Sequence, residues 1–94
     1  MTFSAQHKHS LYLEIAKLLK AGFPVDATLK ALDEQPLPTP CKHFVKSMAA
    51  GIESGKGIAE SVRAIEEIEI TGVELNLIDA GERGGGLAEV FEHL

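Results

Sequence analysis

Two glycine-containing segments are the parts of the chain whose residues and spacing could hold a phosphate group. They read GIESGKG at residues 51–57 and GERGGG at residues 81–86. A P-loop needs four residues between its first glycine and a Gly-Lys pair, then Ser or Thr for magnesium. The first segment has three residues in that interval, followed by Gly57, and neither segment follows a strand pattern. We interpret both as turns between helices, and keep nucleotide or small-ligand binding at the Gly55 and Gly84 loops as the alternative.

Carboxylates gather before and within the second of these segments. Glu82 would repel a phosphate, but it could accept hydrogen bonds from backbone N–H groups at the start of the helix that follows the turn. We therefore interpret Glu82 first as a structural hydrogen-bonding residue and second as a partner contact. The other carboxylates lack the spacing of a calcium-binding EF-hand, so a solvated acidic face is expected. These are Glu66, Glu67, Glu69, Glu74 and Asp79.

The other candidates for metal binding or catalysis are the histidines and the single cysteine. His7 and His9 are two residues apart, which places them on different sides of a helix. His43 and His93 have no metal-binding residue four positions later. Cys41 falls in the first turn of an expected helix, where the dipole can lower a thiol pKa, but no catalytic pattern accompanies it. The sequence predicts surface histidines, an unreactive cysteine and no catalytic, cofactor-binding or metal-binding residue.

Composition limits the class of protein. A chain of 94 residues predicts one domain, residues 1–94. The net charge is −5 and the basic residues are scattered, which argues against nucleic-acid binding. No run approaches 18 apolar residues, so no transmembrane helix is expected. The chain is 45% hydrophobic but only 5% aromatic, so an aliphatic core is expected.

Apolar periodicity of about 3.6 residues predicts an all-α fold, a compact antiparallel bundle of about six short helices. Gly22 should end the first helix, Pro24 should open the second, and Thr39 should be the N-cap of the third. Residues 66–70 alternate like a strand but have no pairing partner, so we expect a loop there. The helices are expected at residues 6–21, 25–34, 39–54, 57–65, from 71 onward, and from 85 or 86 onward.

The last two expected helices meet at the second glycine segment. Thr71 and Glu74 have the spacing of a capping box, which predicts a helix start. Gly81 lies inside that helical pattern, where glycine is costly, so another backbone should come close to it. The glycines at 84–86 can adopt positive φ and allow a sharp turn. The last apolar pattern, which begins at Leu87, still runs where the sequence stops, so we expect a piece of a longer protein.

Four stretches together resemble the cytoplasmic domain of the F proteins of bacterial type II secretion systems. The same family includes the inner-membrane platform proteins of type IV pilus systems. The four stretches are LLKAGFPV at 18–25, the alanine- and leucine-rich segment that follows it, residues 51–62, and IDAGERGGGL at 78–87. Gly57 stands where that family usually has a Ser or Thr N-cap, which should weaken the start of the fourth helix. The match spans nearly the whole chain.

The resemblance implies a six-helix domain in a longer polytopic membrane protein, with no enzyme activity and no cofactor. It implies a scaffold at the cytoplasmic face of the inner membrane, which couples an assembly ATPase to pilin or pseudopilin assembly. Homodimers and a surface divalent metal are features of such domains, but no metal ligands can be assigned here. A helical adaptor outside secretion is a further alternative. The candidates for structural or partner contacts are Gly22, Pro24, Gly55, Gly81, Glu82, Gly85 and Leu87.

Overall fold

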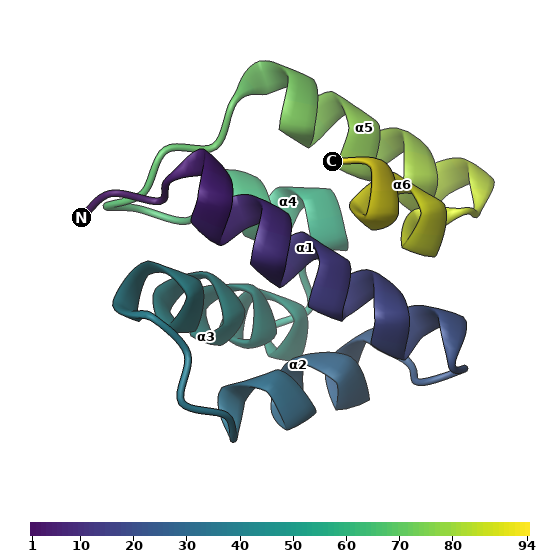
Figure 1. Cartoon of the computed structure of the whole chain (residues 1–94). Coiled ribbons are helices and arrows are strands. Elements are labelled where there is room, and N and C mark those ends of the chain that lie inside the picture. The colour runs from purple at the N-terminus through teal and green to yellow at the C-terminus, as the bar shows by residue number, and fades with distance from the viewer.

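The computed structural model describes residues 1–94 as six α-helices joined by short turns (Figure 1), which confirms the all-α prediction. Helix α1 contacts α2, α3 and α6, so the first and the last helix of the chain lie side by side. Helices α2 and α3 pack together below α1 in the view of Figure 1, and α5 and α6 lie above it. The helices are α1 (Ala5–Lys20), α2 (Val25–Asp33), α3 (Thr39–Glu53), α4 (Ile58–Arg63), α5 (Gly72–Gly84) and α6 (Leu87–His93).

Two helix ends are closed by glycines in the way the sequence predicts. Gly22 and Gly55 have φ of 99° and 96°, and each follows the last turn of a helix. The amides of Gly22 and Phe23 donate to carbonyls of α1, and those of Gly55 and Lys56 donate to carbonyls of α3. These paired bonds form Schellman motifs, which satisfy carbonyls that the helix leaves free.

The predicted N-cap of α3 and the predicted first residue of α6 are wrong, and α1 and α4 begin one residue away from the expected positions. Thr39 is the first residue of α3 and not its N-cap, because the amide of Lys42 donates to the carbonyl of Pro38 and closes the first turn one residue earlier. Helix α6 begins at Leu87, since Gly85 and Gly86 have φ of 83° and 79°, outside the right-handed helical region.

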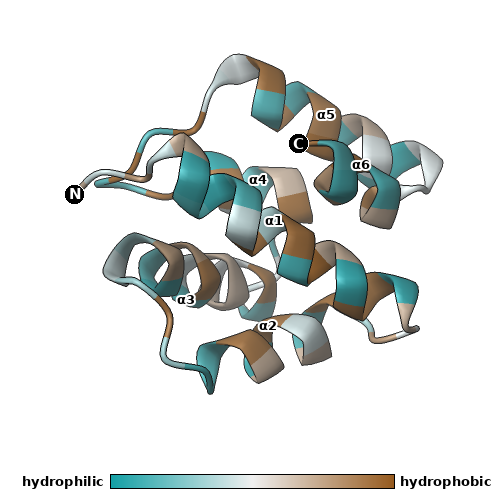
Figure 2. Ribbon diagram, viewed as in Figure 1, coloured by the Kyte–Doolittle hydropathy of each residue, from teal (hydrophilic) through white to brown (hydrophobic).

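The core is mostly aliphatic, as expected, but it contains a cluster of four aromatic rings that the sequence reasoning did not foresee. The ring of Tyr12 lies 5.8 Å from that of Phe44 and 5.5 Å from that of Phe91, and Phe3 packs against both Tyr12 and Phe44. All four side chains are buried. Leucine, isoleucine, valine and methionine side chains make up most of the rest of the core. Figure 2 shows hydrophobic segments (brown) along the helices. Four aromatic residues are enough to form this cluster because they come from three different helices and the N-terminal segment.

The segment before α5 is a loop without strand structure, as predicted. Ile68 and Ile70 pack against the core from this loop, while Glu67 has a positive φ of 72°. Thr71 then opens α5 with the predicted capping box, in which Thr71 and Glu74 exchange hydrogen bonds. No helix of the structure is both long and apolar enough to cross a membrane.

Candidate functional site

The predicted contact residues lie at three turns rather than around one pocket. Gly22 and Pro24 belong to the α1–α2 turn, and Gly55 belongs to the α3–α4 turn. The others lie in the last turn of α5, in the α5–α6 turn and at the start of α6. This turn brings Gly81 against Leu87 of α6. Gly85 has open space around its Cα, so it serves the turn through its backbone conformation.

Glu82 binds a different helix from the one that the sequence suggested. Its Oε2 accepts from the amide of Ile58 at 2.6 Å, and its Oε1 accepts from the amide of Ala59 at 3.0 Å. Both amides belong to the first turn of α4, so the expected contact with the next helix is wrong. The reason is rotational: Gly81 faces α6, and the next residue along α5 points about 100° away from it.

The carboxylate of Glu82 replaces the cap that α4 lacks. Gly57 occupies the N-cap position and has no side chain to accept the free amides. A Cβ at Gly57 would lie 3.0 Å from Oε2 of Glu82, so the glycine leaves room for the carboxylate. The start of α4 is therefore capped from α5, and Gly57 does not leave this helix uncapped.

The same arrangement argues against a phosphate at the Gly55 loop. A phosphate site at a helix start uses backbone amides that point at the ligand. Here Lys56 donates its amide to α3, and the first two amides of α4 bind Glu82. A carboxylate thus holds the position that a phosphate would need, so the structure favours the interpretation of this segment as a turn.

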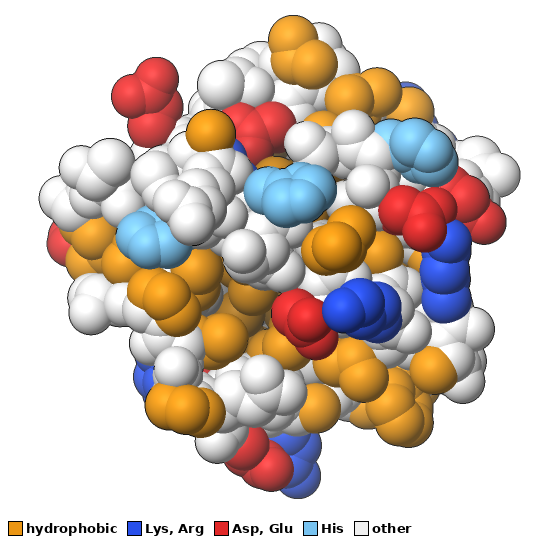
Figure 3. Space-filling model, viewed as in Figure 1, with side chains coloured by type: hydrophobic (Ala, Val, Ile, Leu, Met, Phe, Trp, Pro, Cys, Tyr) orange, Lys and Arg blue, Asp and Glu red, His pale blue; other side chains and the backbone are white.

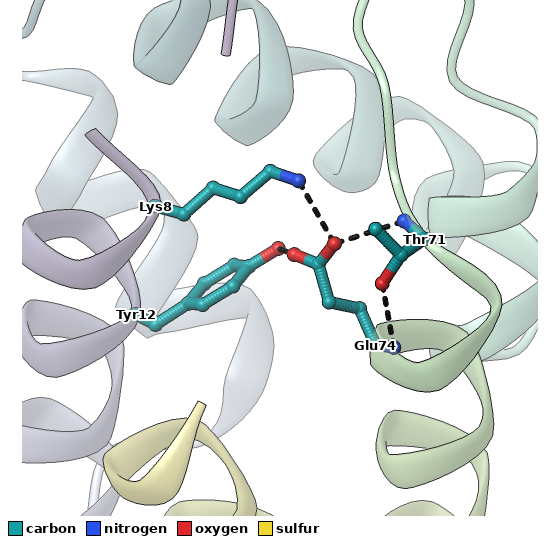
Figure 4. A network of polar contacts seen from close by, with 4 residues as sticks. All are labelled: Lys8, Tyr12, Thr71 and Glu74. Atoms are coloured by element: carbon teal, nitrogen blue, oxygen red, sulfur yellow. Dashed lines mark hydrogen bonds and ion pairs between the residues drawn. The ribbon is translucent and has the colours of Figure 1, made fainter. Parts of the chain in front are cut away.

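Glu74 forms a buried polar network that the acidic-face prediction missed (Figure 4). Only 8% of Glu74 is exposed. The hydroxyl of Tyr12 donates to its Oε1 at 2.6 Å, and the ammonium of Lys8 donates to its Oε2 at 2.8 Å. The amide of Thr71 donates to Oε2 as well, at 2.8 Å. This network ties the first half of α1 to the start of α5.

Burial and hydrogen bonding shift two pKa values in opposite directions in this network. Burial raises the pKa of Tyr12, and the hydrogen bond to Glu74 adds to the rise. Burial also pushes the pKa of Glu74 upward, but the hydrogen bonds from Lys8, Tyr12 and Thr71 outweigh it and hold that pKa below its usual value. The network is therefore a neutral phenol and a charged carboxylate, both with satisfied partners.

The remaining carboxylates do not form one continuous acidic face. Asp79 pairs with Arg83 at 3.1 Å. Of the carboxylates predicted to form that face, only Glu66, Glu67 and Glu69 are exposed without an ion-pair partner. On the face shown in Figure 3, Lys and Arg side chains (blue) are scattered and adjoin acidic ones (red). Of the expected solvated acidic face, only the three glutamates in the loop before α5 remain.

The histidines and the cysteine do not gather into a site. His9 and His93 are exposed, as predicted, and His43 places Nε2 at 2.6 Å from the carbonyl oxygen of Glu66. His7 departs from the prediction, because its Nδ1 is buried without a hydrogen-bond partner. Cys41 is buried, and burial raises the pKa of its thiol. No group of three or more His, Cys, Asp or Glu side chains could hold a metal ion.

A second close approach of helices, at Gly51, was missed by the sequence reasoning. A Cβ at this position of α3 would overlap the side chain of Ser61 on α4, and would lie 3.2 Å from its Cα. Ser61 is 2% exposed, and its hydroxyl donates to the carbonyl of Gly57 at 2.7 Å. A glycine and a serine ten residues apart were the available signal, since small residues allow close helix packing.

Replacement of Gly81 by leucine should lower the free energy of unfolding by about 2 kcal/mol through overpacking. A Cβ there would lie 2.8 Å from Cγ2 of Val90 and 3.3 Å from Cα of Leu87. Thermal unfolding followed by circular dichroism measures the loss. Gly84→Leu is the matched control, because a Cβ at Gly84 meets no atom within 4 Å. Equal melting temperatures for Gly81→Leu and the unmodified chain would contradict the prediction.

Comparison with known families gives one match. A family model described as type II secretion system (T2SS), protein F, matches residues 11–94. The matched region contains five of the six helices in full and most of α1. No curated protein matches the chain.

Proposed function

Because the chain belongs to the protein F family of type II secretion systems, we propose that it is a non-enzymatic scaffold domain of an inner-membrane assembly platform. Its partners in this role are the cytoplasmic assembly ATPase and other inner-membrane components of the system. The domain lies on the cytoplasmic side and transmits ATP-driven motion to pilin or pseudopilin assembly. The family match over residues 11–94 is the observation that carries this proposal.

The chemistry of the buried polar groups supports a scaffold. Both carboxylate oxygens of Glu74 and both of Glu82 accept hydrogen bonds from donors that belong to the chain itself. Such contacts hold helices at fixed relative positions, which a domain that passes on mechanical motion requires. A general acid or base would instead need a proton-transfer group open to a substrate.

A binding titration of this domain against the assembly ATPase encoded beside it tests the proposal. We expect saturable binding, measured by calorimetry, with the mass of the free and bound domain followed by light scattering. The same light-scattering data report whether the free domain is a homodimer. A thermal-shift series with ATP and magnesium is the control, and we expect no change in melting temperature. A rise of several degrees together with no ATPase binding would overturn the scaffold role.

A further inference from the structure

The largest hollow on the surface is a groove of about 780 Å³ between α2 and α3. Its apolar lining includes Leu29 of α2 and Ile52 of α3, and the alanines Ala27, Ala49 and Ala50 complete it. Alanine side chains keep the walls low, so the backbone of another helix can approach closely. In Figure 1, α2 and α3 lie side by side at the lower edge of the molecule.

The charges along this groove follow an order. Asp33, near the end of α2, pairs with Lys42 and Lys46 in the first half of α3, so the two helices are antiparallel. The first turn of α2 therefore lies beside the last turn of α3, which brings Asp26 and Glu53 to the same end of the groove. Both line the groove, and neither forms an ion pair.

The third unpaired charge has the opposite sign. Lys30 also lines the groove, lies one helical turn after Asp26, and has no ion-pair partner. From one end, the groove thus presents two carboxylates and then one ammonium above an apolar floor. The complementary surface has a basic group at that end, an acidic group one turn further, and apolar side chains beneath both.

An exposed aromatic residue precedes this end of the groove. Phe23 is 48% exposed, and it comes three residues before Asp26. The positive φ of Gly22 and the rigid ring of Pro24 restrict the backbone on either side of it. Exposed aromatic side chains on a rigid backbone are frequent anchors in protein interfaces.

We propose that the α2–α3 groove seats an amphipathic helix of a protein partner. The apolar ridge of that helix fills the groove, its basic residue lies between Asp26 and Glu53, and its acidic residue faces Lys30. This inference rests on the proposed scaffold function, for which it names the contact surface. An anionic lipid surface fits poorly, because the two carboxylates would repel it. A symmetric dimer with groove facing groove fits poorly as well, because two hollows cannot fill each other.

A synthetic helical peptide of about 18 residues, or five turns, is the probe. It carries leucines at helical spacing, two lysines at one end and a glutamate one turn further along. We expect saturable binding to the isotope-labelled domain, with chemical-shift changes concentrated on α2 and α3. Ala27→Arg fills the groove at an exposed position and should weaken binding at least ~10-fold. Ala80→Arg is the matched control on the exposed side of α5, and should leave the affinity unchanged.

Charge reversal tests the orientation of the peptide. Asp26→Lys combined with Glu53→Lys should weaken binding ~10-fold, and a peptide with glutamates in place of the two lysines should restore it. Shift changes on another face, or equal affinity for the Ala27→Arg variant, would overturn the proposal. Loss of self-association in the Ala27→Arg variant would overturn it in favour of a second copy. The peptide titration tests whether the groove binds a helix, and the ATPase titration tests the scaffold role. Either proposal can therefore fail without the other.

Discussion

Replacement of Glu74 by alanine is expected to lower the free energy of unfolding by about 3 kcal/mol. The substitution removes three hydrogen bonds to one carboxylate, from Tyr12, Lys8 and the amide of Thr71. It also leaves the buried hydroxyl of Tyr12 without an acceptor and the ammonium of Lys8 without its counter-charge. Both costs fall on the contact between α1 and α5.

Chemical denaturation followed by circular dichroism measures this loss, and two variants divide it. Thr71→Ala removes the hydroxyl of the capping box together with the methyl group of an exposed residue, and should cost about 1 kcal/mol. Tyr12→Phe keeps the ring in the aromatic core and removes the hydroxyl alone. In a double-mutant cycle, Tyr12→Phe should cost much less in the Glu74→Ala background than in the unmodified chain. Additive effects of the two substitutions would contradict the network.

The lowered pKa of Glu74 also predicts acid sensitivity. A carboxyl whose pKa is lower in the folded state binds fewer protons there than in the unfolded state. Its contribution to stability is complete above the unfolded pKa of about 4.3, and is lost as the pH falls through the folded value. Glu74→Gln removes this titrating group, so its stability should fall less steeply below pH ~4.3. If the free energies of unfolding of the two proteins fell equally steeply with decreasing pH, the lowered pKa of Glu74 would be contradicted.

Replacement of Glu82 by alanine should cost about 2.5 kcal/mol, because α4 then loses both acceptors at its first turn. Helix α4 has only six residues, so it has few other hydrogen bonds to keep it folded. Glu66→Ala is the matched control, since its exposed side chain has no bonding partner, and it should change stability little.

A substitution at Gly57 should reverse its effect in the Glu82→Ala background. In the unmodified chain, Gly57→Asp places a second carboxylate against Oε2 of Glu82, which lies 3.0 Å from the new Cβ, and should destabilise the fold. In the Glu82→Ala chain, the new aspartate caps α4 itself and should restore about 1 kcal/mol. The sign change, measured by denaturation of all four proteins, identifies Glu82 as the cap. The same sign in both backgrounds would exclude it.

Local patterns account for the parts of the fold that could be predicted. The six helices, the stops at Gly22 and Gly55 and the capping box of Thr71 each depend on residues a few positions apart. Such interactions form within one or two helical turns, so their residues are near neighbours in the sequence. The errors at Thr39 and at the start of α6 are shifts of one or two residues in these same local patterns.

The partners of the key polar residues could not be predicted in this way. Glu82 binds amides 23 and 24 positions earlier, and Glu74 binds Tyr12 across 62 positions. The sequence marked both as carboxylates near helix ends, but which helix each meets depends on how the helices rotate and cross. The aromatic centre of the core has the same origin, because its four rings converge only when α1, α3 and α6 pack together.

The sequence by itself therefore determined the helical class, the turns and the family of this chain, since helical periodicity, glycine stops and ordered motifs are properties of short segments. Only the tertiary structure decided that Glu74 is a buried link between α1 and α5, that Glu82 caps α4, and that α2 and α3 leave a charged groove. These features depend on distances between residues far apart in the chain. Packing sets those distances, and local pattern does not.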